Sequence, residues 1–182
     1  FKELTDIIRR LIKIAENKNL VFGVKLTNTF PVKITRNELQ GNDMYMSGPP
    51  LYPFSINVAA MIAKEFNGDL PISYSGGADV NNIKDILDTG IYPVTVSTLL
   101  LKQGGYKNIT RLNEKCKDYK RGKITKINVE KLEALASKSI SDFNYSKNIK
   151  KKAEIKGGDY SEFCSKCKNC VDVCPNRSTK LV

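Results

Sequence analysis

The 182-residue sequence predicts an α/β fold with a parallel sheet, followed by a small cysteine-rich segment. Three observations support this prediction. Short apolar runs alternate with segments of helical periodicity over residues 3–101. The connections between them are short and contain glycine, which is typical of parallel strands joined by helices. Four cysteines then lie within residues 164–174.

The first predicted elements are a helix over residues 3–16 and a strand over residues 20–26. Apolar residues of the helix recur on one face at helical spacing. The strand has the near-continuous apolar sequence LVFGVKL, which indicates a parallel strand buried on both faces. Residues 27–50 are rich in Asn, Thr, Pro and Gly, so we expect a long loop there, of the kind that often carries function.

The alternation continues with a helix over residues 55–66 and a strand over residues 71–75. The glycine pair 76–77 ends this strand, and Asp79 is placed to cap a third helix. Gly90 should stop that helix from the C′ position, where glycine accepts a left-handed conformation at no steric cost.

The rest of the chain is more polar. We expect a strand over residues 93–97, a helix or turn over 98–101, and a helix over 129–139. Residues 106–126 are basic and weakly periodic, and 145–160 have the composition of a polar linker. The chain should therefore divide into a sheet domain, a basic helical linker and a cysteine segment, over residues 1–106, 107–160 and 161–182.

Composition excludes several classes of site. The chain has no histidine, which excludes Ser-His-Asp and Cys-His catalysis and every histidine-ligated metal site within it. No apolar run approaches the roughly 18 residues of a membrane span, and no signal peptide precedes the first helix. We expect a cytoplasmic protein with no membrane partner. Because the chain begins at Phe1, we expect a fragment of something longer.

The net charge of +11 is confined to the C-terminal part. Residues 1–100 carry 10 basic and 10 acidic side chains, whereas residues 101–182 carry 20 and 9. The simplest interpretation is a solvated surface that offsets the charge of an anionic thiolate site. A docking face for an acidic redox partner is an alternative. Nucleic acid is the weakest candidate partner, because no recognition motif accompanies the charge.

The cysteines have the spacing C-x2-C-x2-C-x3-C and are followed by Pro175; they are Cys164, Cys167, Cys170 and Cys174. This is the bacterial ferredoxin pattern, in which thiolates hold an iron–sulfur cluster, and we expect one 4Fe-4S cluster. A structural zinc site usually pairs two CxxC knuckles across a longer arm, and the chain has no second arm. Cys174 could instead serve a second cluster in a parent protein. Cys116 should be a plain thiol.

Two successive strand ends carry glycine or small polar residues, in the segments Ser75-Gly76-Gly77-Ala78 and Ser97-Thr98. Backbone N–H groups at such positions favour an anion, and glycine lets the backbone approach a phosphate. In (β/α)8 barrels a phosphate is bound by the loops after strands 7 and 8. The alternative is that the glycines only form a tight turn. Three tyrosines near the strand ends could flank a ligand, although core packing is the simpler interpretation: Tyr45, Tyr52 and Tyr74.

The stretches VFGVKLTNT, MYMSG, PISYSGGADVNNIKDILDTG and PVTVSTLLL resemble the C-terminal half of the dihydroorotate dehydrogenase-like FMN barrel. Dihydropyrimidine dehydrogenase carries the same barrel beside ferredoxin-type clusters. With CVDVCPNR near the C-terminus, the chain is most similar to the selenate reductase iron–sulfur subunit family, whose members are large and multi-domain. The resemblance implies a partial (β/α)8 TIM-barrel-like parallel sheet with helices, followed by a small ferredoxin-type iron–sulfur loop. One βα unit of the family pattern is missing between Lys25 and Asn28.

The resemblance also implies site residues. Lys25 matches a strand-end lysine that contacts the flavin ring and the substrate, and Asn28 and Thr29 match an Asn-Thr pair on the substrate side. These three are the catalytic candidates. A lysine that reaches only solvent is the alternative for Lys25. The residues that match the FMN phosphate site, besides Lys25 as a cofactor contact, are Ser47, Gly48, Gly76, Gly77, Ser97 and Thr98.

The function implied by the resemblance is an iron–sulfur flavoprotein oxidoreductase, in which electrons pass between a 4Fe-4S cluster and an FMN site. Its partners would be other domains or subunits of a multi-component reductase and a small-molecule substrate. Selenate as that substrate is implied by the family name alone. Two other classes stay open, a non-catalytic electron relay that binds no flavin and a zinc-stabilised interaction domain.

Overall fold

The computed structural model describes residues 1–34, 42–101, 104–119, 126–142 and 144–145. The chain divides into two compact units, Phe1–Ser146 and Lys147–Val182, and every described residue belongs to the first. The four predicted cluster ligands lie outside the described residues, as does the predicted cysteine segment.

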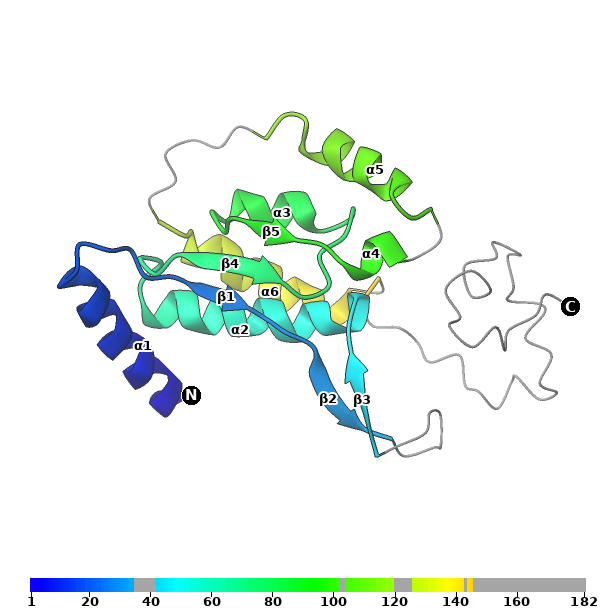
Figure 1. The fold of residues 1–182 in the computed structure, drawn as a ribbon. Coiled ribbons are helices and arrows are strands. Elements are labelled where there is room, and N and C mark those ends of the chain that lie inside the picture. Colours follow the sequence, from blue (N-terminus) through cyan, green and yellow to red (C-terminus); the bar gives the residue numbers. More distant parts are fainter. Residues whose placement is uncertain (35–41, 102–103, 120–125, 143, 146–182) are drawn as a thin grey trace, which may run out of the picture. The chain divides into compact units, whose positions relative to one another are not determined.

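Three short parallel strands form the central sheet, in the order β1 (Val24–Leu26), β4 (Ile72–Ser75) and β5 (Val94–Thr95) (Figure 1). Tyr74 at the centre of the sheet pairs with Leu26 on one side and Val94 on the other. Helices follow in the connections between these strands, so the predicted α/β fold with a parallel sheet is confirmed. The arrangement is that of a partial TIM-barrel-like sheet.

The two faces of this sheet differ in polarity because successive side chains of a strand point to opposite faces. The face that packs against the hydrophobic core carries Val24, Leu26, Ile72, Tyr74 and Val94. The other face carries Lys25, Ser73, Ser75 and Thr95, none of which is fully buried. One face therefore holds the domain together, and the other is open to polar groups.

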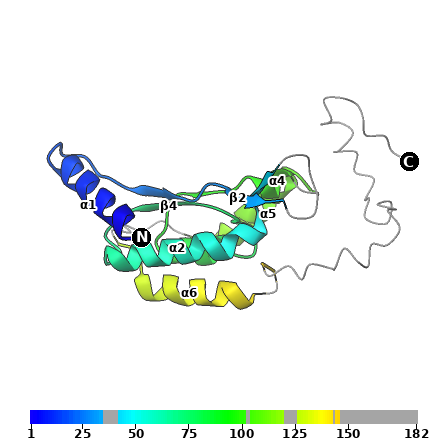
Figure 2. The ribbon, with the colours of Figure 1, turned by 90° about the horizontal axis from the view of Figure 1, so that it is seen from below.

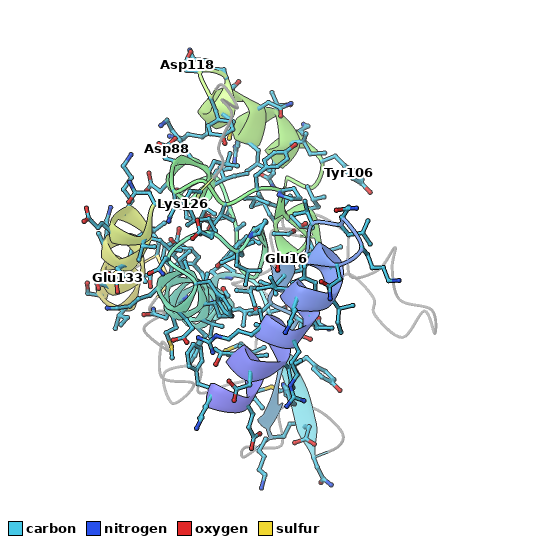
Figure 3. All side chains as sticks on the ribbon, turned by 90° about the vertical axis from the view of Figure 1, so that its left-hand side faces the viewer. Glu16, Asp88, Tyr106, Asp118, Lys126 and Glu133 are labelled. Atoms are coloured by element: carbon cyan, nitrogen blue, oxygen red, sulfur yellow. The ribbon has the colours of Figure 1, made fainter. Side chains whose placement is uncertain are left out.

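Two helices cover the apolar face in succession. Figure 2 shows α2 (Tyr52–Glu65) beneath the strands and α6 (Val129–Ser141) beneath α2. Because α2 lies between the sheet and α6, it is apolar on both sides, and its alanines allow close packing; Ile56, Ala59, Ile62 and Ala63 are all buried. Glu133 of α6, labelled in Figure 3, pairs with Lys64 of α2 at 2.8 Å.

The N-terminal helix α1 (Lys2–Glu16) lies where the sequence predicts it. It buries Thr5 and Ile8, and Arg9 pairs with Glu65 at the end of α2. The strand that follows is shorter than predicted, because only Val24–Leu26 pair with a neighbour.

The prediction of a long loop over residues 27–50 is wrong. It contains a two-stranded antiparallel hairpin, β2 (Phe30–Lys33) with β3 (Asp43–Met46), followed by the 3-10 turn η1 (Pro49–Leu51). Most residues of the hairpin are exposed, and Pro31 lies within its first strand. Because neither face of the hairpin is fully buried, its strands show no clear alternation of apolar and polar residues, and the sequence did not predict them.

The predicted cap at Asp79 is also wrong. Helix α3 (Ile83–Asp88) begins four residues later with Asn82 as its N-cap residue, and Asp79 instead accepts a hydrogen bond from the Asn81 N–H at 2.8 Å. Gly90 follows the helix end with φ of +94°, so its predicted stop position is confirmed.

Two further helices complete the unit. Helix α4 (Thr98–Leu101) follows β5, and α5 (Lys107–Cys116) packs against α3 within the stretch predicted as a basic helical linker. Helices α5 and α6 belong to the same compact unit as the sheet, whereas the sequence places them in a linker over residues 107–160. No helix among the described residues is long and apolar enough to cross a membrane.

Candidate functional site

A cavity of about 310 Å³ opens at the carboxyl ends of the three parallel strands. Ligands of open and closed α/β sheets bind at this edge, where the loops after the strands converge. The structure brings eight of the nine non-cysteine site residues predicted from the sequence to the wall of this cavity, and they are Asn28, Thr29, Ser47, Gly48, Gly76, Gly77, Ser97 and Thr98. They come from four separate loops.

Lys25 is the exception. It is exposed on the polar face of the sheet, opposite Ser73 of β4, and does not line the cavity. Thr27, two residues further along, does line it. Lys25 therefore lies beside the cavity rather than in its wall.

Glycines allow the loops to meet at backbone distance. A Cβ added to Gly48 would lie 2.7 Å from Cγ2 of Thr98, and one added to Gly77 would lie 2.5 Å from the Gly48 carbonyl oxygen. Both glycines have positive φ, +68° and +76°, in the region that other residues rarely adopt. The loops after β3, β4 and β5 consequently pack closely against one another at the cavity.

The peptide groups of the glycine pair have a defined orientation. The Gly76 carbonyl points into the protein, 2.8 Å from Ser55 Oγ and 2.9 Å from Tyr74 Oη. The Gly77 carbonyl accepts a hydrogen bond from Asn82 Nδ2 at 3.0 Å. In a trans peptide the N–H points away from the preceding carbonyl.

It follows that the N–H groups of Gly77 and Ala78 point away from these interior partners. Both residues line the cavity. Neither N–H has an acceptor within the described part of the chain. Adjacent free N–H groups of this kind form a concave site for an anion.

Neutral donors dominate the cavity wall. No lysine or arginine is among the described residues that line it, and hydroxyl groups come from Ser47, Ser97 and Thr98. Asp79 also lines it, but its Oδ1 accepts hydrogen bonds from Asn81 N–H and from Tyr145 Oη at 3.3 Å. An anion here would therefore be held by N–H and O–H groups rather than by an ion pair.

Sequence reasoning missed the interior residues that hold this loop. Ser55 and Asn82 are not among the predicted site residues, and Tyr74 is interpreted as core packing. The one available signal was a serine on the otherwise apolar inner face of α2, because a buried hydroxyl needs a hydrogen-bond partner.

No group of three or more Cys, Asp or Glu that could hold a metal ion occurs within the described ranges. Cys116, at the end of α5, is a partly buried free thiol whose pKa is raised by burial. The predicted 4Fe-4S ligands cannot be placed, since they lie outside these ranges.

Comparison with known proteins gives a consistent match over the described unit. A family model described as "Oxidoreductase YgfK, N-terminal TIM-barrel domain" matches residues 1–147. Two relatives named "Putative oxidoreductase YgfK", from Escherichia coli strains K12 and O157:H7, are 44% identical to the chain over 136 residues. That match covers 75% of this chain but only 13% of each relative. No solved structure matches the chain.

Proposed function

The chain belongs to the family of the N-terminal TIM-barrel domain of oxidoreductase YgfK, and we propose that its cavity binds the phosphate of FMN. The observation that carries this proposal is the pair of N–H groups at Gly77 and Ala78, which have no acceptor among the described residues. Both residues line a cavity whose described wall contains no lysine or arginine. A phosphate monoester suits such a site, because several neutral donors can share its charge.

The residues around the cavity fit the rest of the cofactor as well. The polar face of the sheet, with Lys25 and Ser73, lies next to the phosphate cradle and offers donors to the oxygen and nitrogen atoms of a flavin ring. Asn28 and Thr29 are exposed at the cavity rim, where a small substrate would enter. A bound flavin would supply the interconversion of two-electron and one-electron transfer.

The roles of the chain's own residues follow from these positions. The glycine loop would fix the phosphate, Lys25 would orient the ring, and Asn28 and Thr29 would bind the substrate. Asn28 Oδ1 already accepts a hydrogen bond from the Thr29 N–H at 2.8 Å, which restrains the Asn28 amide group.

We further propose that the cysteine run holds a 4Fe-4S cluster that exchanges single electrons with this site, through Cys164, Cys167, Cys170 and Cys174. The relatives are several times longer than this chain, so the substrate and the electron donor would meet it through other domains or subunits of a reductase. The low number of cysteines outside the run suits a cytoplasmic location.

The test is to purify the chain without oxygen and to count flavin, iron and sulfide in the same sample. We expect about one FMN, four irons and four sulfides per chain after reconstitution. Iron and sulfide with no flavin, even after incubation with FMN, would contradict the flavin proposal and favour an electron relay. Zinc without sulfide would contradict the cluster and favour an interaction domain.

A further inference from the structure

We propose that Ser55 and Tyr74 are positioning residues that hold the Gly76–Gly77 peptide in the orientation that presents its N–H to the ligand phosphate. The inference rests on the proposed function, since it assigns two interior residues to the same site. Neither side chain lines the cavity, and both are fully buried, with relative exposures of 0%. They would act only through the backbone of the glycine pair.

The contacts form a closed triangle. Ser55 Oγ and Tyr74 Oη lie 2.5 Å apart, and the Gly76 carbonyl oxygen lies 2.8 Å from the first and 2.9 Å from the second. Each hydroxyl has one proton, and the 2.5 Å contact between the two hydroxyls uses one of them. Either Tyr74 donates to Ser55 and Ser55 to the carbonyl, or Tyr74 donates to the carbonyl and Ser55 to Tyr74. Ser55 Oγ also lies 3.0 and 3.1 Å from the carbonyl oxygens of Leu51 and Tyr52, which are alternative acceptors within the helix.

The glycine pair needs such a restraint. With φ of +133° at Gly76 and +76° at Gly77, the loop adopts conformations that residues other than glycine rarely adopt. The same freedom allows the peptide between them to rotate, and rotation would exchange the directions of its carbonyl and its N–H. The buried hydroxyl that donates to the carbonyl opposes this, because rotation of the peptide would break that buried hydrogen bond.

The two residues come from different elements, which ties the loop to the core. Ser55 lies on α2 and Tyr74 on the central strand β4. A Cβ on Gly76 would lie 2.8 Å from both Cβ and Oγ of Ser55, so the serine also fills the space behind the loop. The phenol of Tyr74 is protonated and can donate at neutral pH, and burial raises its pKa further.

The chain offers a matched control for the tyrosine. Tyr52 is as deeply buried as Tyr74, but its Oη has no hydrogen-bond partner among the described residues and it does not line the cavity. Tyr52→Phe and Tyr74→Phe therefore remove the same atom from the same core, and only the second removes a donor to the glycine loop.

The experiment compares the full chain with its Tyr74→Phe, Ser55→Ala and Tyr52→Phe variants. Binding of FMN and of riboflavin, which lacks the phosphate, is measured by fluorescence titration. The amide signal of Gly77 is followed by NMR, with and without inorganic phosphate. We expect Tyr74→Phe and Ser55→Ala each to weaken FMN binding by about three- to tenfold and to leave riboflavin binding unchanged. Both should shift the Gly77 amide signal, and Tyr52→Phe should match the parent.

Several outcomes would overturn the inference. If Tyr74→Phe and Ser55→Ala weaken FMN and riboflavin binding equally, the two residues have only a general packing role. If FMN binding is unchanged in both variants, they have no role in phosphate binding. If Ser55→Ala does not fold, Tyr74→Phe with its Tyr52→Phe control decides the matter alone. A parent chain that binds neither FMN nor phosphate would refute the proposed function itself, and that result is read before any variant is made.

Discussion

The two faces of the central sheet differ in the kinds of residue that they carry and in what lies against them. The face covered by α2 is apolar and buried, with Ile72 and Tyr74 at its centre. The opposite face and the loops at the strand ends carry lysine, serine, threonine and glycine around an open cavity. Most residues that form the core are therefore separate from those that line the cavity, and the two sets meet where Tyr74 contacts the Gly76 carbonyl.

The largest effect is expected from the buried face. Ile56 on α2 is fully buried, so Ile56→Ala should lower the free energy of unfolding by about 2–5 kcal/mol through lost burial and a residual cavity. Urea unfolding followed by circular dichroism measures it. Met61→Ala on the same helix is the control, because Met61 is half exposed and should change the free energy by less than about 0.5 kcal/mol. Similar losses at both positions would mean that α2 is not the core layer.

The next effect lies in the glycine loop. Gly77→Ala places a methyl group 2.5 Å from the Gly48 carbonyl oxygen at a φ of +76°, so we expect a loss of about 1–3 kcal/mol in stability and more than about tenfold in FMN affinity. Gly105→Ala is the control, since its φ is also positive but the nearest atom is 3.8 Å away. Equal effects of both substitutions on FMN binding would show that the close approach of the loops is unimportant.

A smaller effect is expected at Lys25, on the polar face. Lys25→Gln should change the free energy of unfolding by less than about 0.5 kcal/mol, because the side chain is exposed. If the ammonium group contacts a flavin, the same change should weaken both FMN and riboflavin binding by about three- to tenfold. Lys33→Gln, on the exposed hairpin strand β2, is the matched control. Unchanged binding of both flavins would leave Lys25 a solvent-facing lysine.

The same contrast explains what the sequence could predict. The parallel strands and the helix α2 were predictable, because burial imposes an apolar pattern that the residues must display. The loops after β4 and β5 were predictable as cavity loops, because parallel strands end at the same edge of a sheet. The loops with Asn28-Thr29 and Ser47-Gly48 were predicted only from the family resemblance. The hairpin of β2 and β3 was not, since its residues are mostly exposed and carry no such pattern.

The support beneath the site was hidden for a different reason. Ser55 and Tyr74 meet the Gly76 carbonyl from positions 21 and 2 residues away in the chain. The sequence shows a serine in a helix and a tyrosine in a strand, and both are common. Only the packing of α2 on β4 brings the two hydroxyls within 2.5 Å of each other and gives them a shared acceptor.

The smallest loss should come from Tyr52, whose phenol has no hydrogen-bond partner among the described residues. Burying a hydroxyl without a partner costs free energy, and burial raises the pKa of this phenol well above its usual range. Tyr52→Phe removes that cost and keeps the ring that packs against Tyr145 at 4.3 Å between centroids. We expect the free energy of unfolding to stay constant or to rise by up to about 1 kcal/mol.

Tyr74→Phe makes the comparison informative, because it deletes a satisfied donor and leaves Ser55 and the Gly76 carbonyl to share one proton. It should lower the free energy of unfolding by about 1–3 kcal/mol, in the opposite direction to Tyr52→Phe. Thermal and urea unfolding of the two variants side by side measure the difference. If Tyr52→Phe lowers the free energy of unfolding as much as Tyr74→Phe does, the Tyr52 phenol must have a hydrogen-bond partner, such as a buried water.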